Sequence, residues 1–143
     1  MTNKNKLSSL LSEYGLSHEN PVNQKIHKVC VPLILLSLLG LLGQIPGPSH
    51  WASYALIALG LLYYSQFKNL SVFVVILSQV IPMMVVIHLL SHHSYQLWLG
   101  IFIVAWIGQF IGHKIEGKKP SFLKDIFFLL IGPLWVSKTF LKY

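Results

Sequence analysis

Apolar residues are grouped into five segments separated by short polar stretches. The segments cover residues 29–43, 51–64, 70–90, 95–112 and 126–137. A straight helix needs about 20 apolar residues to cross a bilayer, so the first two are short unless they extend into flanking polar residues or pair as a tight hairpin. The last contains the sequence "IGPLWV", which predicts a broken or re-entrant segment. We therefore expect about four membrane-spanning helices and an irregular fifth segment.

The polar segment 1–28 has helical patterns of its own. Residues 7–16 predict a short, weakly amphipathic helix with leucines and a tyrosine on one side. Asn20 can N-cap a second helix that begins at Pro21 and runs toward the first apolar segment, where Pro32 predicts a kink. The expected fold class is all-α: a single-domain integral membrane helical bundle that covers the whole chain.

The composition agrees with a protein solvated by lipid. Hydrophobic residues make up 54% of the 143 residues and charged residues only 10%, whereas a soluble domain carries about a quarter charged residues. No apolar run lies close behind the initiator methionine, so we expect no cleaved signal peptide. Cys30 is the only cysteine, which excludes an internal disulfide.

Lysines carry the net charge of +7 and predict the orientation in the membrane. They are concentrated before the first apolar segment and in the 114–124 loop, while 44–50 and 91–95 have none. Cytoplasmic loops are enriched in lysine, so we expect segment 1–28 and the 114–124 loop to be cytoplasmic. No aromatic residues interleave with the lysines, which argues against nucleic acid as a partner and favours membrane lipid.

Three histidines are predicted to meet at this cytoplasmic face. His18 and His27 precede the first span, and His113 follows the fourth. A lone interfacial histidine is ordinary, but three on one face favour a metal site, because neutral imidazole is the commonest transition-metal ligand. A nitrogen-rich site suits iron, zinc or copper rather than magnesium or calcium.

Amide and carboxyl side chains accompany two of these histidines. Asn23 lies four residues before His27 on the same helical face. Gln109 and Glu116 flank His113 on one face of the fourth span. We expect these three polar residues to support the metal ligands through hydrogen bonds.

Other polar residues carry further hypotheses. His88 and His92 are four residues apart at the opposite face and could form half of a second metal site or hold a haem, with only His50 nearby. Lys118 and Lys119 mark the cytoplasmic side, and could also attract a substrate carboxylate at the interface. Neither a serine in a nucleophile elbow nor a phosphate-binding glycine loop is present, so hydrolase and kinase chemistry have no support.

Two motifs resemble the signatures of the Mpo1-like proteins. "YGLSHENPVNQKIHKVCVP", residues 14–32, is similar to their N-terminal motif of Tyr, His, Asn-Pro, Asn, His and Pro. "WIGQFIGHKIEGKKPSF", residues 106–122, is similar to their second motif of Trp, Gln-Phe, Gly-His, Glu, basic residues and Pro. Together the motifs cover about a quarter of the chain, in the expected order and separation; elsewhere the likeness is only in apolar character.

The resemblance implies a membrane dioxygenase that depends on iron(II) and uses O2 to shorten 2-hydroxy fatty acids by one carbon, an α-oxidation step in sphingolipid degradation. It implies that His18, His27 and His113 bind the iron and act in catalysis. Some members have two adjacent histidines where this chain has Ser17 and His18, and some place the glutamate one residue further than Glu116.

Two other functions remain open from the residues alone. A haem-binding or electron-carrying membrane bundle would use the histidines as axial ligands, and a structural or lipid-binding protein would use no metal.

The chain is closer in size to bacterial than to eukaryotic members of the family, and it ends in "TFLKY" without a lumenal retention signal. We therefore expect a multi-pass protein of a bacterial inner membrane rather than of the endoplasmic reticulum.

Overall fold

The computed structural model describes residues 2–90 and 95–143, and all regular elements in these ranges are helical. The elements are α1 (Asn3–Gly15), α2 (Pro21–Leu42), α3 (Trp51–Ser65), α4 (Leu70–Leu89), α5 (Tyr95–Glu116), the 3-10 turn η1 (Ser121–Leu123), α6 (Phe128–Val136) and the 3-10 turn η2 (Lys138–Phe140). The predicted all-α fold class, including the short N-terminal helix, is confirmed.

Three helices, α2, α4 and α5, are long and apolar enough to cross a membrane. The side chain of Asn20 accepts a hydrogen bond from Val22 N and caps α2, which continues through Pro32 to Leu42 as one 22-residue helix. The short first apolar segment is therefore lengthened by polar residues on its N-terminal side. Over the predicted 51–64 span, α3 is apolar but has only 15 residues, so a fourth crossing stays a prediction.

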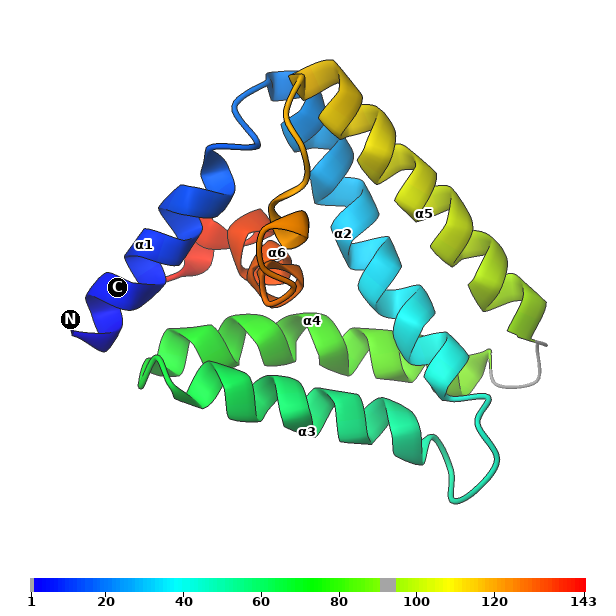
Figure 1. Ribbon diagram of the computed structural model, residues 1–143. Helices are drawn as coiled ribbons and strands as arrows, with labels where there is room; N and C mark the ends of the chain where they lie inside the picture. The colour runs from blue at the N-terminus through cyan, green and yellow to red at the C-terminus, as the bar shows by residue number, and fades with distance from the viewer. Residues whose placement is uncertain (1, 91–94) are drawn as a thin grey trace.

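The helices enclose a roughly triangular space (Figure 1). The end of α1, the start of α2 and the end of α5 come together near one corner, while α3 and α4 lie along the opposite side. The short helix α6 lies between these elements, and its residues 131–135 are all buried. With nine residues and Pro133 inside it, α6 is about 14 Å long, too short to cross a bilayer.

Helices α2 and α5 pack closely because α5 presents two glycines to α2. A Cβ added at Gly108 or Gly112 would come within 3.0 Å of the Sγ atom of Cys30 or the Oδ1 atom of Asn23, respectively. Small residues four apart allow membrane helices to approach at backbone distance. The glycine pair therefore sets the separation between the start of α2 and the end of α5, where the histidines lie.

The short helices α1 and α6 are held together by apolar packing. Leu7, Leu11 and Tyr14 on α1 belong to the same buried cluster as Ile131 and Trp135 on α6. Burying such side chains stabilises the fold by about 1.5–3 kcal/mol each. This packing fixes the end of α1, from which His18 follows after a short turn.

Candidate metal centre

The structure brings the three histidines at the corner of the fold into one buried group. His18 lies in the turn after α1, His27 on the second turn of α2 and His113 on the last turn of α5. Their exposed fractions are 1%, 1% and 6%. Each offers one ring nitrogen, and these atoms lie within 4.8 Å of one another. The Nε2 atoms of His27 and His113 are 3.1 Å apart.

The backbone orients two of the three rings. Nδ1 of His18 donates to the carbonyl oxygen of Tyr14 at 2.6 Å, and Nδ1 of His27 donates to that of Asn23 at 3.0 Å. In each case the acceptor is four residues earlier: for His27 it lies on the first turn of α2, and for His18 it lies in the last turn of α1. Because Nδ1 carries the hydrogen, Nε2 presents its lone pair, as a metal-ligating histidine requires.

Aromatic packing keeps His18 out of water. Its ring stacks on Tyr14, with 4.2 Å between ring centroids and an interplanar angle of 9°, and lies 5.0 Å from the ring of Trp135. Burial, assisted by the nearby His113, lowers the pKa of His18 from 6.5 to about 4. The imidazole is therefore neutral, and able to bind a metal, at physiological pH.

An unsatisfied atom of the group fits a bound transition metal. Nε2 of His18 is buried without a hydrogen-bond partner, a situation that costs about 1–3 kcal/mol. The spacing within the group suits an ion such as zinc or iron, whose bonds to imidazole are about 2.0–2.1 Å long. Within the described residues, no carboxylate belongs to this group.

Glu116 joins the end of α5 to the start of α2. Its carboxylate accepts hydrogen bonds from the backbone N–H groups of Glu19 and Asn20 at 2.9 Å and from the side-chain amide of Asn23 at 3.0 Å. The same amide donates to the carbonyl of Ser17. Both carboxylate oxygens of Glu116 thus accept hydrogen bonds that hold the segment carrying His18 against α5.

The two lysines considered for a substrate carboxylate have different surroundings. Lys118 donates to the carbonyl oxygen of Leu16 at 2.7 Å and forms an ion pair with Glu19 at 2.6 Å. Lys119 is exposed and lines a surface hollow together with Ser121. Lys118 is therefore already used to hold the turn that contains His18, whereas Lys119 faces solvent near the site.

The rival histidine pair lies elsewhere in the fold. His88 is exposed, its Nε2 atom is 2.9 Å from the hydroxyl of Tyr54, and its ring is 4.2 Å from that of His50. His92 lies outside the described residues, so a site formed by His88 and His92 is untested. Within the described part of the chain, the only group of three or more metal-ligating side chains is that of His18, His27 and His113.

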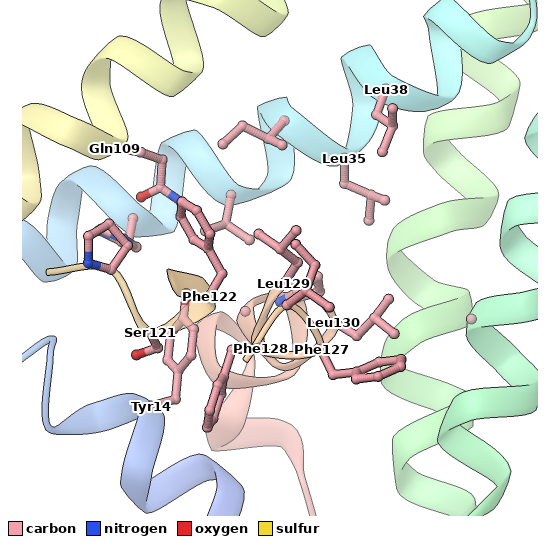
Figure 2. A pocket seen from close by; sticks show the side chains of 18 of the residues that line it. Tyr14, Leu35, Leu38, Gln109, Ser121, Phe122, Phe127, Phe128, Leu129 and Leu130 are labelled. Atoms are coloured by element: carbon pink, nitrogen blue, oxygen red, sulfur yellow. The ribbon is translucent and has the colours of Figure 1, made fainter. Parts of the chain in front are cut away.

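A cavity of about 440 Å³ extends from the histidines into the fold. Its polar end, as we call it, is formed by His18, His27, Gln109, His113 and Ser121. Beyond them the lining is almost entirely apolar, with α2, α3, α4, α5 and α6 as its walls. Figure 2 shows Gln109 and Ser121 on one side of this space, with Leu35 and Leu38 further along α2.

Some residues that shape the site were not among those predicted from the sequence. Ser17 and Ser121 are joined by a 2.5 Å hydrogen bond between their hydroxyls, although 104 residues separate them in sequence. The stacking of Tyr14 on His18 could have been anticipated from their four-residue spacing, and the close packing of α2 on α5 from the sequence "GQFIG". No local signal indicates the serine pair.

Comparison with known proteins agrees with the two sequence motifs. The chain is similar to the 2-hydroxy-palmitic acid dioxygenase MPO1 of Saccharomyces cerevisiae, with 29% identity over 141 residues that cover 94% of this chain and 79% of the yeast protein. No solved structure matches the chain. A family model described as 2-hydroxy-palmitic acid dioxygenase Mpo1-like matches residues 4–143, and the chain therefore belongs to the Mpo1-like family.

Proposed function

We propose that this protein is an iron(II)-dependent membrane dioxygenase that shortens long-chain 2-hydroxy fatty acids by one carbon, with O2 as co-substrate. The observation that carries the proposal is a buried group of three imidazoles at the polar end of an otherwise apolar cavity. A 2-hydroxy fatty acid has the same division, since its carboxyl and hydroxyl groups lie at one end of a long hydrocarbon chain.

In this proposal His18, His27 and His113 hold the iron, and their neutral state leaves the charge of the ion to attract the anionic headgroup. Iron(II) with three nitrogen ligands retains open positions and supplies redox chemistry toward O2. The apolar walls exclude water around the reacting carbons, which strengthens electrostatic contacts and limits side reactions.

The reaction balances with O2 as the only oxidant. The bond between C1 and C2 breaks, C1 leaves as CO2, and C2 becomes the carboxyl carbon of the shortened acid, with one water formed for each O2 consumed. The two carbons together lose four electrons, which is the number that one O2 accepts.

Polar residues beside the histidines are suited to position the headgroup. The Oε1 atom of Gln109 is buried at the polar end without a hydrogen-bond partner, so it can accept a hydrogen bond from the 2-hydroxyl. Lys119 could draw the carboxylate to the interface, although an exposed lysine contributes little binding energy by itself.

Lipid-facing residues suggest how the substrate enters. The cavity reaches Ile126, Phe127 and Leu129, whose side chains are exposed. A fatty acid dissolved in the bilayer could therefore enter sideways between them. The lysine distribution supports a site at the cytoplasmic face of the membrane, and we propose that this membrane is a bacterial inner membrane.

Metal content and oxygen consumption test the proposal. Protein purified in lipid nanodiscs and reconstituted anaerobically with iron(II) should bind one iron per chain, and should consume O2 only when 2-hydroxypalmitate is added. His27→Ala should lose both properties, while His88→Ala, on the other side of the fold, should keep them. Absence of bound iron and of O2 consumption in the reconstituted protein would refute the proposal, and a strong Soret band would favour the haem-binding alternative.

A further inference from the structure

The far side of the cavity from the histidines is formed by α3 and α4. These helices lie opposite the corner where α1, α2 and α5 meet (Figure 1). This side, which we call the floor, is lined by Leu56, Ile57, Gly60 and Tyr64 on α3 and by Ile76 and Val80 on α4. The Tyr64 hydroxyl donates to the carbonyl oxygen of Leu130, so the contacts that the floor offers a ligand are apolar.

The distance from the histidines to the floor suits a long acyl chain. Residues of α2 from His27 to Leu39 line the cavity, and the helical rise makes this stretch about 18 Å long. Leu39 belongs to the same apolar cluster as Leu56 and Ile57, so this stretch ends at the floor. An extended chain of the length of palmitate reaches from one end to the other.

Gly60 leaves room at the floor that a side chain could fill. A Cβ at this position would meet only the Cε2 atom of Tyr64, at 3.9 Å, which is an ordinary van der Waals contact. Tyr64 is fixed by a 2.7 Å hydrogen bond from its hydroxyl to the carbonyl oxygen of Leu130. The space beside Gly60 is therefore bounded by a fixed ring and open toward the cavity.

We propose that the floor, and Gly60 in particular, sets the length of the acyl chain that this protein accepts. The inference rests on the proposed function for the chemical nature of the ligand, and it assigns the end of the chain to a named part of the fold. A larger side chain at position 60 should occupy the space that the last methylenes of the ligand would otherwise fill.

The test is chain-length selectivity of binding, measured without the metal. Binding of palmitate and laurate to the chelator-treated protein in lipid nanodiscs would be measured for the wild type and for Gly60→Leu. Each methylene excluded from an apolar site costs about fourfold in affinity. Gly60→Leu should therefore weaken palmitate binding roughly 60-fold if three methylenes are displaced, and should change laurate binding by less than about threefold.

Two further variants keep the test decisive. Ala58→Leu places the same side chain on an exposed position of α3 outside the cavity and should leave both affinities unchanged. Leu56→Ala should enlarge the floor and favour stearate over palmitate. In the iron-loaded enzyme, kcat/KM for 2-hydroxypalmitate relative to 2-hydroxylaurate should shift in the same direction as binding.

The outcomes separate this inference from the proposed function. Selective loss of palmitate binding in Gly60→Leu supports the inference, whether or not the protein consumes O2. Equal effects on palmitate and laurate, or no difference between Gly60→Leu and Ala58→Leu, would overturn it. If the wild-type protein consumes O2 with 2-hydroxypalmitate but the variants give this second result, the proposed function stands and the proposed role of the floor is refuted.

Discussion

Glu116 allows the sharpest test of how the candidate metal centre is built, because its carboxylate lies close in sequence to His113 and yet forms its hydrogen bonds elsewhere. It accepts hydrogen bonds from two backbone N–H groups at the start of α2 and from the amide of Asn23. An acid at a helix N-terminus is also favoured by the helix dipole. We therefore expect Glu116 to position the ligands rather than to bind the metal.

The magnitude of the effect follows from these contacts. Hydrogen bonds to a charged group contribute about 1.5–3 kcal/mol each, but the N–H groups of Glu19 and Asn20 can turn to water when the carboxylate is removed. The buried amide of Asn23 keeps only its bond to the Ser17 carbonyl. We expect Glu116→Ala to destabilise the metal-free protein by about 2–3 kcal/mol and to lower iron(II) affinity by about 10–100-fold, as loss of a ligand-orienting group does.

Thermal unfolding of the metal-free protein and anaerobic iron(II) titration against a competing chelator measure the two effects. Glu116→Gln keeps the size and one acceptor oxygen and should give intermediate values. Glu19→Ala removes an exposed ion pair with Lys118, which is worth at most about 1 kcal/mol, and serves as the control. At saturating iron(II), Glu116→Ala should still bind one ion; complete loss, as in His27→Ala, would show that the carboxylate is a ligand, and no change would show that its contacts are irrelevant.

Two further predictions concern packing and pH. Gly112→Ala would push the side chain of Asn23 away from Glu116, so it should cost about 1–3 kcal/mol in thermal unfolding and weaken iron binding. Gly100→Ala on the same helix, where a Cβ meets nothing within 4 Å, should do neither. Since burial lowers the pKa of His18 from 6.5 to about 4, the unfolded state binds more protons between these values. His18 should therefore contribute a loss of up to about 3 kcal/mol of stability when the metal-free protein is acidified across that window, and His18→Ala should remove this part of the loss.

The helical fold class could be predicted from the sequence because hydrophobic segments directly indicate the residues that contact lipid or the protein core. The cap at Asn20 follows from local chemistry, so it too could be read from the residues, whereas α6 runs through Pro133 to Val136 as one short helix. The orientation of α3 and α4 opposite the three histidines could not, because it depends on packing between segments whose apolar surfaces are chemically alike. The cavity between these two helices and the histidines could not be predicted for the same reason.

The candidate site was accessible from the sequence to the extent that its chemistry is local. His27 with Asn23 and His113 with Glu116 share helical faces, and spacing alone indicates this. That Glu116 reaches across to the backbone of Glu19 and Asn20 is a property of two helix ends brought together, and spacing within one helix cannot reveal it. From sequence alone, a glutamate near a candidate metal-binding histidine can therefore be either a metal ligand or a residue that holds two helix ends together.

Local contacts and contacts between helices determine different features of the site. His18 and His27 are each oriented by a carbonyl four residues earlier, so the direction of the His27 ring depends on its own turn of α2 and that of the His18 ring on the end of α1 and the turn that follows it. The separation between them and His113 is set instead by the Gly112 contact and by Glu116, both of which join α2 to α5. Metal affinity should accordingly depend more steeply on the packing of α2 against α5 than on the stability of either helix. A metal held across that junction would in turn stabilise it by the binding free energy, because the unfolded chain has no such arrangement of ligands.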